Sequence, residues 1–132
     1  MIGVDTNVLI RYFTEDSPHQ TLLARKLIED DQRELIFVSL MAVTELVWVL
    51  RSNYGFARIQ IAKILEDMLN TKGFQVQNED EVSYATEELR QGNHDFADVL
   101  LGALGAWKDC ETTYTFDAQA ARLPEFRRVP GY

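Results

Sequence analysis

The fold is decided by the stretch Ile2-Gly3-Val4-Asp5-Thr6-Asn7-Val8-Leu9, in which a short apolar strand passes directly into a helix. Ile2–Val4 predicts a buried strand, and the apolar spacing over Val8–Phe13 predicts a helix. Thr6 or Asn7 stands where the N-cap of that helix is expected, because short polar side chains accept hydrogen bonds from the free N–H groups of the first turn. Asp5 is left between the strand and the helix.

The same alternation of strand and helix continues along the chain. Ser17-Pro18 and Ser39 are typical of helix starts, and Asn53-Tyr54-Gly55 is typical of a helix end. Helices are expected at about 18–30, Leu40–Ser52, Ala57–Asn70, Glu79–Gln91, Asp95–Lys108 and Ala118–Leu123, and strands at Glu34–Val38, Gly73–Gln77, Thr112–Phe116 and Phe126–Val129. This order predicts an α/β fold with a mainly parallel sheet covered on both faces. Right-handed crossovers then bring the carboxyl ends of the strands to one edge.

The composition is that of one ordinary globular domain spanning residues 1–132. Of these residues 46% are hydrophobic and 26% charged. No apolar run approaches the roughly 20 residues that span a bilayer, and no leader-like segment is present. The single cysteine, Cys110, excludes an intrachain disulfide, and two histidines are too few for a zinc site. We therefore expect a cytoplasmic protein with no membrane partner.

The formal net charge of −8 counts against nucleic-acid binding, because contacts to phosphate need lysine and arginine. The objection weakens if carboxylates gather in one site where cations neutralise them. Neutralising four carboxylates takes the charge from −8 to −4 and leaves arginines to touch phosphate, namely Arg11, Arg51, Arg58, Arg122, Arg127 and Arg128. The acidic balance also suits a basic protein partner.

Asp5 directly follows the first predicted strand, and Asp117 directly follows the fourth. Both are therefore expected at the same edge of a parallel sheet. An Asp between a strand and a helix is also a favoured N-cap, and for either residue alone capping is the better explanation. For Asp5 this explanation is weaker, since Thr6 and Asn7 are each able to cap.

Glu45 lies inside the apolar run Leu40–Leu50, where no helix face is polar enough to be solvated. An ionised carboxylate buried there without a partner costs several kcal/mol or shifts its pKa. It is too far from either helix end to be a cap. A salt bridge to Arg51 or Arg11 is the alternative to a functional role.

Asp98 lies in a helix that is apolar nearly all round and therefore expected to be buried. Acids in a first turn complement the helix dipole, which accounts for Asp95 better than for Asp98. Gly102 and Gly105 share the stripe of Asp98, and each costs up to about 1 kcal/mol relative to Ala. Two glycines on one stripe predict that another backbone approaches closely there.

These acids carry more weight together than singly. Two carboxylates at strand ends and two on apolar helices cannot be buried near one another without a cation. Ligands that are all oxygen favour Mg²⁺ or Mn²⁺ over zinc. Such a site suits phosphodiester hydrolysis by metal-activated water, which needs no catalytic His or Ser–His pair. The predicted catalytic and metal-binding residues are Asp5, Glu45, Asp98 and Asp117.

Other side chains near these positions give weaker evidence of function. Thr115 shares the face of Asp117. It either orients a carboxylate or a water molecule, or it is a strand residue without a functional role. Asn7 either caps or supports the metal ligands. Arg11 is expected to be a solvated arginine. Trp48, Trp107 and Phe96 are expected in the core.

With these residues in place, the chain resembles the PIN-domain family, and within it the VapC toxins of toxin–antitoxin pairs. The resemblance is carried by Val4-Asp5-Thr6-Asn7-Val8-Leu9, Glu45 in its helix, Asp95-Phe96-Ala97-Asp98 and Thr115-Phe116-Asp117, in the family's order over essentially the whole chain.

The resemblance implies a three-layer α/β/α sandwich and a Mg²⁺- or Mn²⁺-dependent endoribonuclease. Asp5, Glu45, Asp98 and Asp117 are the acidic quartet it implies, with Asn7 and Thr115 as polar helpers. Asp95 is an additional acid whose role stays open. The resemblance further implies an RNA substrate, inhibition by a cognate antitoxin, and a homodimer, for which the Leu40–Asn70 hairpin has apolar residues to spare.

Four other functions compete. A phosphotransferase of the haloacid dehalogenase type needs a second Asp where this chain has Asn7, and a response-regulator receiver needs an Asp where Gln77 and Asn78 stand. Both fit poorly. A catalytically inactive binding module of the same fold is disfavoured by the intact acids, and a housekeeping nuclease differs from a toxin only by its partner.

Overall fold

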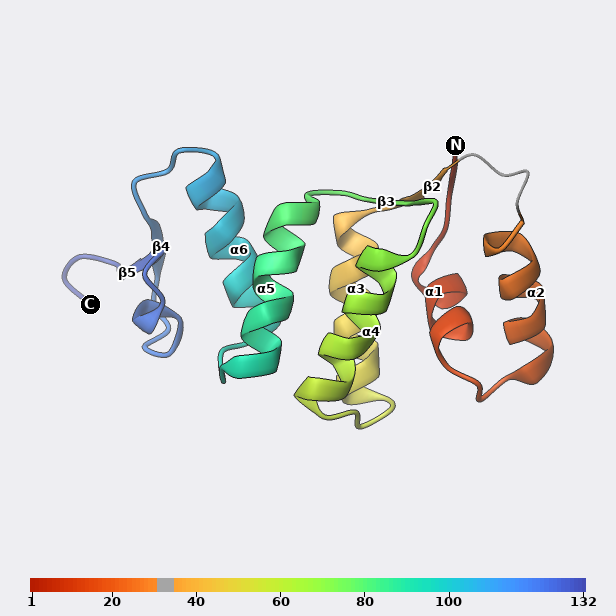
Figure 1. Ribbon diagram of the computed structural model, residues 1–132. Coiled ribbons are helices and arrows are strands. Elements are labelled where there is room, and N and C mark those ends of the chain that lie inside the picture. Colours follow the sequence, from red (N-terminus) through yellow and green to blue (C-terminus); the bar gives the residue numbers. More distant parts are fainter. Residues whose placement is uncertain (31–34) are drawn as a thin grey trace. The chain divides into compact units, whose positions relative to one another are not determined.

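The computed structural model describes residues 1–30 and 35–132. The chain forms two compact units, Met1–Glu79 and Asp80–Tyr132, and each is described by itself. Helices and strands alternate through both units (Figure 1), as expected for an α/β protein. The predicted start of the second strand at Glu34 lies outside the described residues.

The first unit is built on a parallel sheet of three strands in the order β1-β2-β3: β1 is Ile2–Gly3, β2 is Ile36–Val38 and β3 is Phe74–Val76. Ile2 pairs with Ile36, and Ile36 pairs with Phe74. The parallel pairing confirms the sequence prediction. Its consequence is that the segments following β1 and β2 leave the sheet at the same edge.

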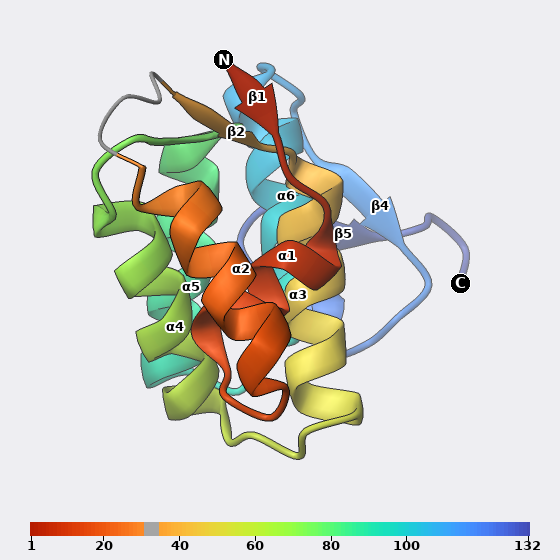
Figure 2. The ribbon, with the colours of Figure 1, turned by 90° about the vertical axis from the view of Figure 1, so that its right-hand side faces the viewer.

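Four helices complete the first unit: α1 (Thr6–Phe13), α2 (Pro18–Ile28), α3 (Leu40–Ser52) and α4 (Arg58–Asn70). α1 packs against α2 and α3, and these three helices lie together in Figure 2. The core between the helices is made of fully buried side chains, including Leu9, Leu46, Leu50, Leu65 and Met68. Ser39 caps α3 as predicted, with its hydroxyl accepting a hydrogen bond from the N–H of Ala42 at 3.1 Å.

The second unit contains α6 (Phe96–Trp107), β4 (Thr113–Thr115), the short 3₁₀ helix η1 (Ala120–Arg122) and β5 (Phe126–Arg128), preceded by α5 (Glu79–Gln91). β4 and β5 pair in parallel, with Thr113 opposite Phe126. Within the short α-helix predicted at Ala118–Leu123, only Ala120–Arg122 are helical, and they form one turn of 3₁₀ helix. The two strands form a sheet separate from the three-stranded one, where the sequence predicts a single sheet.

Gly102 and Gly105 explain how closely α6 lies to the strands of its own unit. A Cβ added at Gly102 would meet the Phe126 ring at 2.6 Å, and one at Gly105 would meet the hydroxyl of Thr113 at 2.7 Å. The predicted close approach is present, but side chains make it rather than a backbone. Because these glycines are fixed against the strands, they hold α6 and the acids at its start in place.

Several predictions of burial are wrong. Trp48 and Trp107 are 55% and 52% exposed, so neither belongs to the core, whereas Phe96 is buried as expected. α6 is buried on one face only, since Leu101 is 56% exposed. The apolar residues on every side of α6 therefore did not show that every side of this helix is buried. Across residues 1–30 and 35–132, no helix has the length and apolar character needed to cross a membrane.

Candidate functional site

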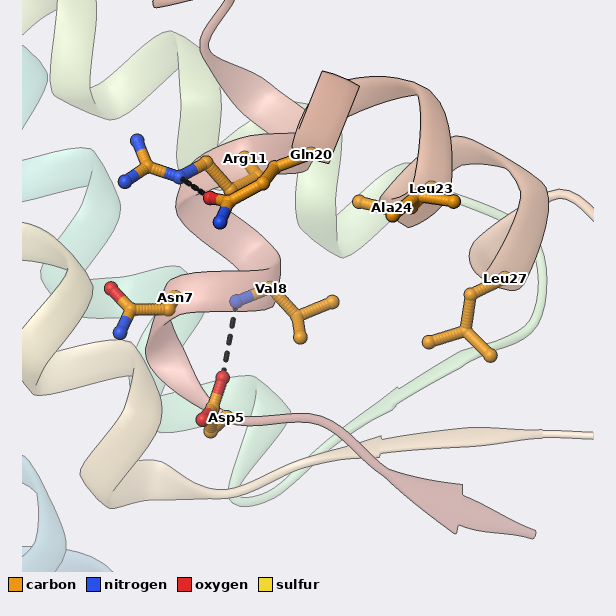
Figure 3. Close-up of a pocket in the computed structure, with 8 residues that line it drawn as sticks. All are labelled: Asp5, Asn7, Val8, Arg11, Gln20, Leu23, Ala24 and Leu27. Atoms are coloured by element: carbon orange, nitrogen blue, oxygen red, sulfur yellow. Dashed lines mark hydrogen bonds between the residues drawn. The ribbon is translucent and has the colours of Figure 1, made fainter. Parts of the chain in front are cut away.

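Asp5 is the N-cap of α1. Its carboxylate Oδ1 accepts a hydrogen bond from the N–H of Val8 at 3.1 Å (Figure 3). The expectation that Thr6 or Asn7 caps this helix is wrong, because α1 already begins at Thr6 and Asp5 stands at the N-cap position. The capping hydrogen bond uses only Oδ1 of the carboxylate, so Oδ2 remains able to coordinate a cation. The cap also fixes the direction in which Asp5 points.

Glu45 is exposed, contrary to the expectation that α3 has no solvated face. The buried residues of α3 fall on the opposite side, and Met41 and Trp48 flank Glu45 on the exposed side. Within the described residues Glu45 makes no ion pair with Arg11 or Arg51, the alternative weighed from the sequence. Burial of its carboxylate therefore gives no support to the prediction that Glu45 binds a metal ion.

Asp5 and Glu45 line the same hollow in the first unit. Its volume is about 360 Å³, and it is lined by Gly3, Val4, Asp5, Thr6, Phe37, Ser39, Met41, Ala42 and Glu45. Asp5 follows the carboxyl end of β1, and Glu45 lies in the second turn of α3. The sequence places Asp5 and Asp117 at one sheet edge, but β4, which precedes Asp117, belongs to a separate two-stranded sheet.

The second unit contains Asp95, Asp98 and Asp117, and the charges of Asp95 and Asp117 act on Asp98. Asp95 stands at the N-cap position of α6 without a side-chain capping bond, and Asp98 lies in the first turn. The pKa of the Asp98 carboxyl is raised above its ordinary value, first by partial burial and then by the negative charges of Asp95 and Asp117, while His94 acts in the opposite direction.

Asp117 is held by two hydrogen bonds. Its N–H donates to the hydroxyl of Thr115 at 2.9 Å, and its carboxylate Oδ1 accepts from the N–H of Gln119 at 2.8 Å. Thr115 therefore orients the backbone of Asp117, which is a more indirect role than contact with its carboxylate. The side chain of Asp117 supports the turn that leads into η1.

Asn7 and Arg11 line a second cavity of the first unit, of about 340 Å³, between α1 and α2 (Figure 3). In the part of the chain that the structure describes, no hydrogen bond links Asn7 to Asp5. Arg11 is not the solvated arginine expected. Its Nε donates to Gln20 at 2.6 Å, and its Nη1 pairs with Asp16 at 3.0 Å.

The four predicted ligands thus fall two in each unit: Asp5 and Glu45 in the first, Asp98 and Asp117 in the second. Neither unit gathers three His, Cys, Asp or Glu side chains, among its described residues, in a group able to hold a metal ion. Met41 also lines the hollow that contains Asp5 and Glu45, and it was not predicted from the sequence. Its position would have indicated this, because Met41 precedes Glu45 by four residues and therefore lies on the same helix face.

The family model of the PIN domain matches residues 2–126. The match covers nearly the whole chain and runs through both units, so the chain belongs to the PIN-domain family. No curated protein matches it. Among solved structures it is similar to the Mycobacterium tuberculosis toxin VapC20, described as cleaving the sarcin-ricin loop, with 18% sequence identity, 92% of this chain and 94% of that chain covered, and a TM-score of 0.46.

Proposed function

We propose that this chain is a metal-dependent endoribonuclease that hydrolyses RNA phosphodiester bonds, and that it acts as the VapC-type toxin of a toxin–antitoxin pair. Membership of the PIN-domain family supports the nuclease class. The sequence carries all four acids that the resemblance requires, Asp5, Glu45, Asp98 and Asp117. That intact set speaks against an inactive binding module.

One observation carries the proposal: partial burial, and after it the negative charges of Asp95 and Asp117, raise the pKa of the Asp98 carboxyl. A cluster of carboxylates that repel one another is unfavourable in the isolated protein, and a bound cation removes the repulsion. All the available donors are carboxylate oxygens, which are the ligands of hard cations. The residues therefore fit Mg²⁺ or Mn²⁺.

Asp5, Glu45, Asp98 and Asp117 are the residues that would hold the cation. When bound, a divalent cation lowers the pKa of water and offsets the charge that develops on phosphate oxygens. The chain's own contribution is positioning. The cap to Val8 fixes Asp5, and the bond from the Asp117 N–H to Thr115 fixes the start of the segment that carries Asp117. Ligands held in this way lose little freedom when the cation binds.

The toxin role is more specific than the nuclease activity, and it rests on the resemblance to VapC proteins. A chain of net charge −8 suits an antitoxin with a basic segment that reaches the acidic site. A homodimer is part of the same expectation. A small reading frame for a basic partner directly beside this one, together with growth arrest on expression of this chain alone, would separate a toxin from a housekeeping nuclease.

The nuclease activity is tested with Asp98→Asn, which keeps the shape of the side chain and removes its charge. We expect RNA cleavage in Mn²⁺ by the wild type and loss of cleavage in the variant, with an unchanged circular dichroism spectrum. Asp80→Asn is the matched control, because Asp80 is an exposed aspartate of α5 and should cleave like the wild type. Equal cleavage by Asp98→Asn and Asp80→Asn would show that the acidic cluster is not catalytic.

A further inference from the structure

Arg11 lies in the last turn of α1, and its guanidinium group contacts three other parts of the first unit. Its Nε donates to Oε1 of Gln20 in α2 at 2.6 Å (Figure 3), and its Nη1 donates to Oδ1 of Asp16 at 3.0 Å. The same Nη1 donates to the hydroxyl of Tyr54, which follows α3, at 3.3 Å. Because the donors of a guanidinium group have a fixed planar arrangement, one side chain holds all three partners. Arg11, Asp16, Gln20 and Tyr54 are here called the Arg11 clamp.

Asp16 closes the clamp into a ring. The hydroxyl of Tyr54 donates to Oδ2 of Asp16 at 2.8 Å, while Oδ1 accepts from Arg11. The hydrogen bond from Tyr54 is the main cause that lowers the pKa of the Asp16 carboxyl, and Arg11 acts in the same direction. Both oxygens of Asp16 are thus engaged, and the three side chains join α1, the α1–α2 turn and the segment after α3.

The clamp is the second of two ties between α1 and α3. The first is the pairing of β1 with β2, where Gly3 lies opposite Phe37, a few residues before each helix begins. The clamp joins the last turn of α1 to Tyr54, which lies two residues beyond the end of α3 at Ser52. Between the two ties the helices pack against each other. Their relative tilt therefore changes only if one of the ties breaks.

This tilt matters because each helix carries one acid of the hollow described above. Asp5 stands at the N-cap of α1, and Glu45 lies in the second turn of α3. The eight residues of α1 span about 12 Å, so a tilt of about 5° displaces one end relative to the other by about 1 Å. Binding sites tolerate errors of only about 0.5 Å in the positions of their ligands. The clamp is thus placed to control the separation of Asp5 from Glu45.

We propose, on the basis of the metal-dependent nuclease function proposed above, that Arg11 is a positioning residue: through the Arg11 clamp it sets the separation of Asp5 from Glu45, and thereby the affinity of the protein for its divalent cation. Arg11 acts through α1 and does not touch the cation. Its contribution to folding is small by comparison, because the side chains of Arg11 and Asp16 are 28% and 48% exposed, and exposed ion pairs stabilise proteins little.

The test is calorimetric titration of the RNA-free protein with Mn²⁺. Arg11→Met keeps the apolar stem and removes the guanidinium group, and we expect it to raise the Kd for Mn²⁺ about 10-fold. Tyr54→Phe removes only a hydroxyl group, so it should fold like the wild type and raise the Kd by a smaller factor. The matched control is Arg25→Met, which removes the exposed ion pair of Arg25 with Glu15 at 3.0 Å, between α2 and the same turn. It should bind Mn²⁺ like the wild type.

A second comparison separates positioning from a merely structural role. Asp5→Asn removes the charge through which Arg11 is proposed to act. In the Asp5→Asn background, Arg11→Met should therefore change the Kd for Mn²⁺ by less than about 2-fold, although it changes the Kd of the wild type about 10-fold. A residue that only stabilises the fold would lower the Tm in both backgrounds and leave the Kd of the folded protein unchanged, which would overturn the inference.

Failure of the inference and failure of the nuclease assignment give different results. If the wild type binds Mn²⁺ and cleaves RNA, but Arg11→Met and Tyr54→Phe keep the wild-type Kd, only the positioning role is overturned. An unchanged Kd with a raised KM for RNA would make Arg11 a substrate contact, which also overturns it. The same holds if Arg25→Met weakens Mn²⁺ binding as much as Arg11→Met. A wild type that neither binds Mn²⁺ nor cleaves RNA overturns both proposals.

Discussion

The hydroxyl of Thr115 accepts a hydrogen bond from the backbone N–H of Asp117 at 2.9 Å, so the last residue of β4 sets the conformation of the acid that follows it. We expect Thr115→Val, which keeps the shape and loses the acceptor, to lower kcat/KM for RNA about 10-fold, the usual size for a residue that orients a metal ligand. Thr115→Ser should retain most of the activity. A Thr115→Ser variant as weak as Thr115→Val would place the effect in strand packing instead.

The two roles of Asp5, helix cap and metal ligand, are separable by substitution. Asp5→Asn keeps a side-chain oxygen for the N–H of Val8, so we expect its free energy of unfolding to stay within about 0.5 kcal/mol of the wild type while RNA cleavage is lost. Asp5→Ala should lose cleavage and also about 1 kcal/mol of stability. Urea unfolding of the metal-free proteins and cleavage in Mn²⁺ measure the two effects. If Asp5→Asn cleaves RNA, Asp5 is a cap alone.

The raised pKa of Asp98 makes a prediction for stability against pH. A carboxyl that holds its proton more tightly in the folded than in the unfolded chain favours folding at low pH, and this contribution is lost as the pH rises from about 3.8 through the folded-state pKa. Asp98→Asn carries no charge, so in EDTA it should be more stable than the wild type at pH 7. The difference should vanish near pH 3.

The control for this measurement is again Asp80→Asn, which should follow the wild type across the pH range. Adding Mn²⁺ should reverse the order at pH 7, because the cation stabilises the folded wild type by binding it. Thermal melts in EDTA and in Mn²⁺ provide both comparisons. A metal-free Asp98→Asn that is less stable than the wild type at pH 7 would contradict the repulsion among these acids.

Gly102 is expected to be intolerant of a side chain. A Cβ there would lie 2.6 Å from Cε2 of Phe126, and relief of such overpacking costs about 1–3 kcal/mol, part of which the better helix propensity of alanine offsets. Gly102→Ala should therefore destabilise the protein. Combined with Phe126→Leu, which makes room for the methyl group, the same change should cost less, and denaturant unfolding of the four proteins measures this coupling. Additive effects would show that the two residues are not in contact.

The sequence predicted the elements well where local signals agree. α3 begins and ends at the predicted residues because Ser39 supplies an unambiguous cap and Asn53-Tyr54-Gly55 a clear stop. The start of α1 was predicted one or two residues late because Asp5, Thr6 and Asn7 are all able to cap, and the structure shows that Asp5 accepts the capping hydrogen bond. The parallel pairing followed from the alternation of elements.

Burial was predicted poorly, and the reason is physical. In an apolar helix such as α3, periodicity does not distinguish a residue packed in the core from one left exposed, since both are hydrophobic. The exposed side of α3 carries Met41 and Trp48, so Glu45 lies beside apolar residues without being buried. Glu45 and Asp98 were predicted from the apolar character of their helices, and the exposure of Glu45 removes that argument for Glu45. Whether the four acids share a cation is a prediction for the experiments above.

The division of the four acids between the two units has a consequence for synthesis of the chain. Asp5 and Glu45 leave the ribosome with the first unit, whose sheet pairs only strands within residues 1–79. Asp98 and Asp117 follow later; at typical translation rates the interval from Asp5 to Asp117 is on the order of ten seconds. On the proposed function, a nascent chain that has already folded its first half cannot cut RNA. On the same proposal, the message and ribosome that produce the chain would be spared until Asp117 has been made.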